Sequence, residues 1–318
     1  MTFKTPDFWY KTATDIPLSK RLLIPVGWLY GALTAVRLKV TKPYKAGIPV
    51  ICIGNLTAGG SGKTPVALAL MKLIQSTDIY KSPCFLTRGY GGTQAGPVTV
   101  GPDTGLAAGD EALLLMQTAP TIIAHDRAAG ARYAQNCGHD LIIMDDGFQN
   151  PHLYKDISLV VVNGQTGWGN GHIVPAGPLR EFIKAGLQRA TALIALDGPP
   201  PQEAGKPVVK AHCRVSCPLP RGSRVLGFCA LGQPARFRAT LSDLGLDVIA
   251  FTTFPDHYHY TAHDIDDLKA AAARQNLHLI TTEKDAVKII GQDGISTVHL
   301  EVIFDSPDDL LNLIKAQI

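Results

Sequence analysis

Residues 48–74 read IPVICIGNLTAGGSGKTPVALALMKLI, and this stretch decides the fold. It opens with an apolar run over 48–53, continues with a glycine-rich turn over 54–64, and ends in a helical pattern over 65–74. A buried strand, a glycine-rich turn and a helix form the local unit of many nucleotide-binding α/β domains. The stretch therefore predicts a phosphate-binding turn between a strand and a helix of an α/β domain.

The turn contains most of a P-loop pattern. A P-loop reads GxxxxGK[ST]: its backbone N–H groups and the following helix N-terminus hold phosphates, its Lys neutralises phosphate oxygens, and its hydroxyl binds Mg²⁺. The chain matches the end of this pattern, but Thr57 stands where the leading glycine belongs. The expected phosphate-binding residues are Thr57, Ala58, Gly59, Gly60, Ser61, Gly62, Lys63 and Thr64. A plain glycine-rich turn is the alternative, while a dinucleotide-binding turn is disfavoured because the glycines lack the GxGxxG spacing.

Short apolar runs and helical stretches alternate along the rest of the chain. Further buried strands are expected at 84–87, 121–124, 141–144 and 158–162, with helices at 110–118 and 126–137. A second series has strands at 224–229, 247–252 and 278–281 and helices at 234–244, 263–275 and 283–290. This rhythm predicts two α/β/α domains of P-loop or Rossmann-like type.

Changes in composition suggest the domain boundaries. We expect an apolar, basic-flanked N-terminal segment over 1–46, a P-loop domain over 47–198, a linker over 199–223 and a second α/β domain over 224–318. The linker is rich in proline and contains one β-rich piece at 207–215.

The composition excludes several classes of protein. The 318 residues are 46% hydrophobic and only 18% charged, which excludes a disordered chain. Glycine and proline are frequent but follow no collagen-like period, so a fibrous protein is excluded. The six cysteines form no CxxC pair, which disfavours a zinc site and is typical of a reducing compartment.

The N-terminal segment combines basic charge with an apolar run. Residues 1–45 hold eight Lys and Arg against two Asp, although the whole chain has a net charge of only +3. The uncharged run Leu22–Val36 has 15 residues, whereas a bilayer crossing takes about 20. Trp28 and Tyr30 within it, and basic residues on both flanks, favour a helix that lies in or dips into a membrane surface. A buried core helix is the alternative.

A second chemical signal is the run LIIMDD over 141–146, an apolar strand that ends in two carboxylates. In a P-loop protein, an acid at such a strand end orders Mg²⁺ or its water beside the phosphates. We therefore expect Thr64, Asp145 and Asp146 to hold Mg²⁺. Solvated turn residues or helix caps are the alternative for the two acids.

Several short motifs occur in a fixed order along the chain. They are GNLTAGGSGKTP at 54–65, TRGYG at 87–91, GDE at 109–111, DDGFQ at 145–149, PAGPLRE at 175–181, FPDH at 254–257 and TEKD at 282–285. Together these motifs resemble the tetraacyldisaccharide 4'-kinase family, the lipid A kinases of Gram-negative bacteria. The resemblance covers about nine tenths of the chain.

The resemblance implies an activity and its setting. The reaction would transfer the ATP γ-phosphate to the 4'-hydroxyl of a tetraacylated glucosamine disaccharide 1-phosphate, giving lipid IVA, with ATP and Mg²⁺ as cofactors. The enzyme would act at the cytoplasmic face of the inner membrane as a peripheral or monotopic protein, with no nucleic acid and no required protein partner. Its two α/β domains would be joined by a β-ribbon.

The resemblance also assigns roles to residues. GDE at 109–111 reads by itself as two acids in the first turn of a helix, which the helix dipole favours regardless of function. The resemblance instead makes Asp110 the base that accepts the proton of the sugar hydroxyl, with a pKa raised by burial or by Glu111. His257 would pair with Asp110 across the cleft, and Lys63 completes the catalytic set.

Weaker assignments follow from the remaining motifs. The expected substrate contacts are Arg88, Glu111, Gln149 and Glu181. Thr282 and Asp285 read as a capping box, so TEKD is interpreted as structural with a secondary nucleotide contact. Asn150 stands where relatives commonly have His, and it is therefore left out of the catalytic set.

Two other function classes remain open. A P-loop ATPase acting as a membrane-associated assembly or partitioning switch would share Lys63, Thr64 and Asp145, but it would not need His257 on a second α/β domain. A nucleic-acid-binding NTPase would explain the basic segment, but the aromatic and basic residues there surround an apolar run rather than a polar groove. ATP turnover that requires an acylated sugar, DNA or neither distinguishes the three classes.

Overall fold

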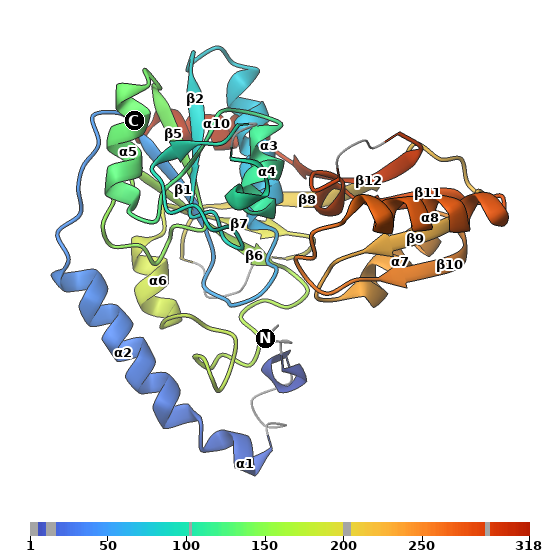
Figure 1. Ribbon diagram of the computed structural model, residues 1–318. Coiled ribbons are helices and arrows are strands. Elements are labelled where there is room, and N and C mark those ends of the chain that lie inside the picture. Colours follow the sequence, from blue (N-terminus) through green and yellow to red (C-terminus); the bar gives the residue numbers. More distant parts are fainter. Residues whose placement is uncertain (1–5, 11–16, 102–103, 200–204, 290–292) are drawn as a thin grey trace.

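One mixed sheet runs through the computed structural model, which describes residues 6–10, 17–101, 104–199, 205–289 and 293–318 (Figure 1). The strands are β1 (Val50–Gly54), β2 (Pro83–Thr87), β3 (Val98–Thr99), β4 (Thr121–Ile123), β5 (Leu141–Asp145), β6 (Ile157–Asn163), β7 (Ala192–Leu196), β8 (Val208–Ser216), β9 (Arg224–Cys229), β10 (Asp247–Thr253), β11 (His278–Thr282) and β12 (Ile295–Phe304). Their order in the sheet is β10-β9-β11-β12-β8-β7-β6-β1-β5-β2-β4-β3.

The helices lie on both faces of this sheet. They are α1 (Leu18–Arg21), α2 (Ile24–Val40), α3 (Lys63–Gln75), α4 (Asp110–Met116), α5 (Arg127–Asn136), α6 (Ile183–Arg189), α7 (Pro234–Asp243), α8 (Ala262–Arg274), α9 (Glu283–Ala286) and α10 (Pro307–Lys315), with short 3-10 turns at Asp7–Tyr10 and Gly105–Ala108. The P-loop lobe comprises β1–β7 with α3–α6, and the second lobe comprises β9–β11 with α7–α9.

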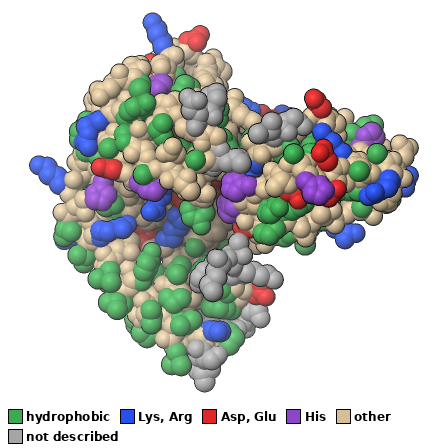
Figure 2. All heavy atoms as spheres, viewed as in Figure 1, with side chains coloured by type: hydrophobic (Ala, Val, Ile, Leu, Met, Phe, Trp, Pro, Cys, Tyr) green, Lys and Arg blue, Asp and Glu red, His purple; other side chains and the backbone are tan. Residues whose placement is uncertain are grey.

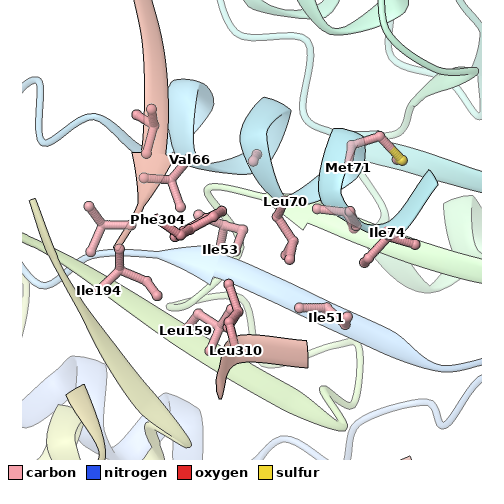
Figure 3. Packing of buried hydrophobic residues seen from close by; sticks show 14 of the residues in the cluster. Ile51, Ile53, Val66, Leu70, Met71, Ile74, Leu159, Ile194, Phe304 and Leu310 are labelled. Atoms are coloured by element: carbon pink, nitrogen blue, oxygen red, sulfur yellow. The ribbon is translucent and has the colours of Figure 1, made fainter. Parts of the chain in front are cut away.

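The core of the P-loop lobe has two halves because β1 and its neighbours are buried on both faces. On one face, Ile51 and Ile53 pack with Val66 and Leu70 of α3 (Figure 3). On the other face, the alternate strand residues pack against α5 and α6. Such continuous apolar strands are typical of parallel sheets covered by helices on both sides.

The second lobe repeats this three-layer arrangement at one end of the sheet (Figure 1). Helix α7 covers one face through Phe237 and Leu241, and α8 covers the other through Ile265 and Leu268. The two lobes are joined by β8 and β12, which pair with each other antiparallel over 211–216 and 299–304. The fold class that the sequence predicts is therefore confirmed, including the β-rich connection.

Two details differ from the sequence-based expectation. The linker 199–223 was expected to separate two domains, yet β8 within it pairs with β7 and β12, so the sheet continues through it. The second domain was expected to run to residue 318, but α10 returns to the P-loop lobe, where Leu310 and Ile314 join the core around α3. The apolar face of α10 is buried there, which the local sequence pattern could not assign to a lobe.

Helix α9 is shorter than expected. It ends at Ala286, whereas the prediction extended it to 290, a residue outside the described ranges. The Thr282 hydroxyl accepts a hydrogen bond from the Asp285 backbone N–H at 3.1 Å, as the capping interpretation requires.

Helix α2 lies along the edge of the P-loop lobe with most of its apolar side chains in solvent. Trp28 and Leu29 are 60% and 61% exposed, and Leu22, just before the helix, is 79% exposed. The alternative of a buried core helix is therefore wrong. Contact with the protein is made by Gly27 and Gly31. None of the described helices combines the length and apolar character needed to cross a bilayer.

The two glycines explain how α2 packs so closely. An added Cβ on Gly27 would lie 2.6 Å from the backbone oxygen of Ile173, and one on Gly31 would lie 2.9 Å from the Phe182 ring. Only glycine allows this approach, so the helix packs through its glycine face and its larger apolar side chains point into solvent.

Candidate active site

The glycine-rich turn connects β1 to α3 as expected, and Gly62 fixes its shape. Gly62 is the residue before α3 and has φ +81°, in the left-handed region. A Cβ on Gly62 would also lie 2.4 Å from the Leu196 side chain, whereas a Cβ on Gly60 would meet no atom within 4 Å. The turn is therefore packed against the sheet at Gly62 and faces open space at Gly60, where a phosphate has room.

Neighbouring loops hold the turn in place. The Asn55 amide donates to the Thr57 backbone oxygen at 2.6 Å and to the Ser61 hydroxyl at 2.7 Å. The Ala58 N–H donates to the Pro178 carbonyl at 2.6 Å. The motifs at 54–65 and 175–181 thus form one braced unit.

Gln149 and Glu181, expected as substrate contacts, are engaged within this brace. The Gln149 amide donates to the Asn55 carbonyl at 2.8 Å and to Glu181 Oε1 at 2.9 Å. Glu181 is 2% exposed, and its other carboxylate oxygen accepts from Arg189. A buried carboxylate needs such partners, so the structure gives both side chains a bracing position behind the turn.

Asp145 is placed beside the turn by the parallel pairing of β1 with β5, in which Ile53 lies next to Asp145. The Thr64 hydroxyl donates to Asp145 Oδ2 at 2.8 Å, while Oδ1 is buried with no hydrogen-bond partner. Burial, and then the charge of Glu111, raises the pKa of Asp145 to about 7. An orphaned carboxylate oxygen next to a hydroxyl suits a hard cation that takes its other ligands from phosphate and water.

The raised pKa predicts an effect of Asp145→Asn on stability. An unfolded Asp ionises near pH 4, so as pH rises from about 4 to 7 the unfolded state ionises first and the metal-free protein loses stability. We expect Asp145→Asn to raise the melting temperature by a few degrees at pH 8 in a chelator, and to change it little at pH 4. The measurement is thermal unfolding at both pH values.

The matched control for this prediction is Asp146→Asn. The Asp146 carboxylate is stabilised by cations, so its replacement should lower the melting temperature at pH 8, opposite to the first variant. Equal shifts in the same direction would contradict the assignment of an unpaired buried charge to Asp145.

Asp146 contacts two cations of the site. Its Oδ1 lies 3.7 Å from Lys63 Nζ and 2.9 Å from Arg180 Nη1. Burial alone would raise the pKa of Asp146, but Lys63 and Arg180 outweigh it and the pKa is lowered. Its backbone has φ +49°, which Asp tolerates better than most residues. Asp146 therefore connects the P-loop lysine to the arginine of the motif at 175–181.

Asp110 and His257 meet although they are 147 residues apart. Asp110 is the first residue of α4 and is 2% exposed, while His257 follows β10 on the second lobe. His257 Nδ1 lies 3.1 Å from Asp110 Oδ2, and because a carboxylate only accepts, the imidazole donates. His257 has φ +60°, a backbone conformation that residues other than glycine rarely adopt. This strained residue is also the one that contacts Asp110.

The pKa of Asp110 shifts in the direction opposite to the expected one. We predicted that burial or Glu111 would raise this pKa. Burial does act in that direction, but the hydrogen bond from His257 and the Lys288 ammonium outweigh it, and the pKa of Asp110 is lowered. Glu111 instead acts on Asp145, whose pKa it helps to raise.

Lys288 belongs to the site, although the sequence patterns did not predict it. Its side chain is fully buried, and its Nζ lies 3.5 Å from Asp110 Oδ2 and 2.8 Å from Asp285 Oδ1. The available signal was Lys288 itself, which lies in an otherwise apolar stretch three residues after Asp285, the last residue of the TEKD motif. Such charges are rarely buried unless they are paired.

Two remaining positions lie at the edge of the site. Arg88 is exposed directly after β2, and its charge contributes to lowering the pKa of the buried Arg127. Asn150 uses its side-chain oxygen to accept from the His152 N–H at 2.9 Å, so it closes a turn after DDGFQ.

One known protein family matches nearly the whole chain. The family model described as tetraacyldisaccharide-1-P 4'-kinase matches residues 19–318. The chain belongs to this family. Two curated members named tetraacyldisaccharide 4'-kinase illustrate the similarity: that of Rhodospirillum rubrum is 42% identical over 96% of this chain and 95% of its own length. That of Methylorubrum extorquens is 43% identical with the same coverage.

A solved structure extends the family comparison to three dimensions. LpxK from Aquifex aeolicus, determined as an "apo" form in complex with ATP, is 27% identical and has a TM-score of 0.78. The match covers 94% of this chain and 99% of the Aquifex aeolicus chain. The 4'-kinase fold is therefore shared along nearly the whole of both proteins.

Proposed function

We propose that this protein transfers the γ-phosphate of ATP to the 4'-hydroxyl of a tetraacylated glucosamine disaccharide 1-phosphate, giving lipid IVA. Membership of the 4'-kinase family supports the reaction, and the ATP complex of the Aquifex aeolicus relative supports the donor. The observation that carries the proposal in this chain is the contact of Asp110 with His257, which joins a carboxylate in the first turn of α4, on the P-loop lobe, to a histidine of the second lobe.

The proposed chemistry divides between the two sides of the site. Lys63 neutralises the migrating phosphoryl group, while the backbone N–H groups of residues 57–62 hold the phosphates. Asp110 accepts the proton of the acceptor hydroxyl, whose oxygen forms a bond to the γ-phosphorus as the bond to the leaving ADP oxygen breaks. His257 donates to Oδ2 of Asp110 and so keeps the base oriented.

We infer that Mg²⁺ is held by Thr64 and Asp145, with Asp146 near it. The buried, unpartnered Oδ1 of Asp145 and the adjacent Thr64 hydroxyl support this assignment. When bound, the ion would neutralise negative charge on the phosphates. Asp145 must lose its proton to bind a cation, so Mg²⁺ affinity should fall as pH drops below about 7.

The reaction is tested by supplying different partners to the purified protein with ATP and Mg²⁺. We expect ADP formation to depend on an acylated disaccharide 1-phosphate and to be unaffected by DNA. ATP turnover that is equally fast without any acceptor would favour an assembly ATPase, and turnover that requires DNA would favour a nucleic-acid-dependent NTPase.

We propose that α2 attaches the protein to the cytoplasmic face of the inner membrane. Its exposed apolar residues are Val26, Trp28, Leu29, Tyr30, Leu33, Val36 and Val40, and Leu22 just before the helix is exposed as well. Figure 2 shows hydrophobic side chains gathered over the part of the surface where α2 lies. Patches of this kind mark membrane or protein contacts, and Lys20, Arg37 and Lys39 beside it add attraction for anionic lipid.

This placement also brings the site to its substrate. The Arg37 guanidinium on α2 donates to the Gln149 backbone oxygen at 3.0 Å, which ties the helix to the loop that follows Asp145 and Asp146. An acceptor with four acyl chains lies in the leaflet, and its extraction would cost about 0.8 kcal/mol per exposed CH₂. Attachment of the enzyme at the headgroup level avoids that cost.

Replacing Leu22, Trp28, Leu29 and Leu33 with Ser should release the protein from anionic vesicles and raise KM for membrane-presented acceptor. ATP affinity and stability should change little, because these side chains are exposed. The measurement is co-sedimentation with vesicles at low and high salt. A matched control replaces Ile249 and Leu300, which are 42% and 40% exposed elsewhere on the surface. If the α2 variant still pellets like the parent, the helix is not the anchor.

A further inference from the structure

Lys288 is a fully buried cation at the boundary between the lobes. Its Nζ contacts the carboxylates of Asp285 and Asp110 and lies 5.3 Å from the centre of the Tyr260 ring. An ammonium group is retained in such a place only when neighbouring charges compensate for its lost hydration. Two carboxylates and an aromatic face supply that compensation here.

The position of Lys288 is set by the second lobe. Asp285, its nearest partner, accepts from the Ala230 N–H at 3.2 Å and from the Thr282 hydroxyl at 2.8 Å. Ala230 directly follows β9 and Thr282 ends β11, so the carboxylate is fixed to the sheet of that lobe. Asp110, in contrast, belongs to α4 of the P-loop lobe.

Both charged partners of Asp110 approach the same oxygen. His257 Nδ1 and Lys288 Nζ lie 3.1 and 3.5 Å from Oδ2, and neither contact involves Oδ1. The second lobe thus contacts one oxygen of the carboxylate from two separate segments. This arrangement leaves Oδ1 as the oxygen for the acceptor hydroxyl.

We propose that Lys288 is a positioning residue, which holds Asp110 of the P-loop lobe as an oriented carboxylate from its place on the second lobe. This inference rests on the proposed role of Asp110 as the general base. It makes the charge and the orientation of the base depend on side chains of the second lobe.

The charges around Asp110 should set how the activity depends on pH. The charged groups that act on Asp110 are His257, Lys288 and Lys284, and the Tyr260 ring lies beside Lys288. Removing the Lys288 charge should raise the pKa of the carboxylate, because an adjacent cation favours the ionised form. The acidic limb of the kcat profile should then move up by about one pH unit.

The first experiment compares Lys288→Met, Lys288→Arg and the control Lys269→Met, a lysine on α8 of the same lobe. We expect Lys288→Met to lower kcat about tenfold at neutral pH, to shift the acidic limb upward, and to change KM for ATP little. Lys288→Arg should keep most of the parental kcat and a nearly parental acidic limb. Lys269→Met should match the parent in both. An unshifted acidic limb in a folded Lys288→Met variant would overturn the proposal.

A second variant guards against misfolding, since Lys288→Met leaves Asp285 buried without its cation. Lys288→Met with Asp285→Asn removes the charged pair together and keeps the oxygen that Ala230 and Thr282 contact. If Lys288 acts on Asp110, the paired variant should still show the shifted limb. Recovery of the parental pH profile would mean that Lys288 serves stability alone.

A double-mutant cycle separates this proposal from the one on which it rests. In an Asp110→Asn background, Lys288→Met should cause no further loss of kcat, because its effect passes through the missing carboxylate. Additive losses would overturn the role of Lys288. High activity of Asp110→Asn alone would instead overturn the assignment of Asp110 as the base.

Discussion

Lys63→Ala is expected to reduce phosphoryl transfer by at least about 10³-fold while the fold stays intact. The side chain is 11% exposed and begins α3 at the phosphate-binding turn. Its removal deletes the positive charge that would meet the migrating phosphoryl group, where no other P-loop cation is present to replace it. The measurement is transfer of labelled phosphate to the acylated disaccharide, with circular dichroism to verify folding.

The matched control is Lys72→Ala on the same helix. Lys72 is 59% exposed and pairs with Glu301 at 3.7 Å, away from the turn. Surface pairs of this kind contribute about 0–1 kcal/mol, so this variant should keep parental activity. Near-parental transfer by a folded Lys63→Ala variant would contradict the assignment of the turn as a phosphate site.

Asp110→Asn is expected to lower kcat by about 10²-fold or more with little change in KM for ATP. The amide keeps the size of the carboxylate, and its oxygen can still accept from His257 and Lys288, so the geometry should survive. What is lost is the ability to take the proton of the acceptor hydroxyl. Steady-state kinetics with ATP and acceptor varied separately would measure the effect.

Asp308→Asn provides the control for Asp110→Asn. Asp308 also lies in the first turn of a helix, α10, but it is exposed and distant from the P-loop turn. Its replacement removes the same interaction with a helix dipole and should leave kcat unchanged. If Asp110→Asn raises KM for ATP strongly and preserves kcat, Asp110 acts in nucleotide or metal binding and not in proton abstraction.

The lowered pKa of Asp110 changes how the base is expected to work. A base that is ionised well below neutral pH is available under all physiological conditions but takes a proton less readily than one with a pKa near 7. Its advantage would then come from placement: burial removes water, and His257 and Lys288 fix the orientation. At saturating Mg²⁺, we expect the acidic limb of the parental kcat profile to lie well below pH 7.

Local sequence patterns determined much of this protein. Apolar runs with short spacings predict the strands around β1, and the glycine-rich turn with Lys63 and Thr64 predicts the phosphate site between β1 and α3. These features depend on backbone conformation and hydrophobic period, which neighbouring residues set by themselves. The order of the seven motifs was enough to indicate the family, which the comparison over residues 19–318 shows.

Only the tertiary structure decided how the charged groups act on one another. Three features depend on contacts between distant segments of the chain. They are the contacts of Asp110 with His257 and Lys288, the burial of Glu181 behind the turn, and the outward apolar face of α2. The pKa of a carboxylate depends on the charges around it and on its loss of contact with water. For Asp110 the second lobe supplies those charges, from residues at least 147 positions away in the sequence. The sequence shows which residues are charged, whereas the packing of the two lobes determines which of those charges are buried together, away from water.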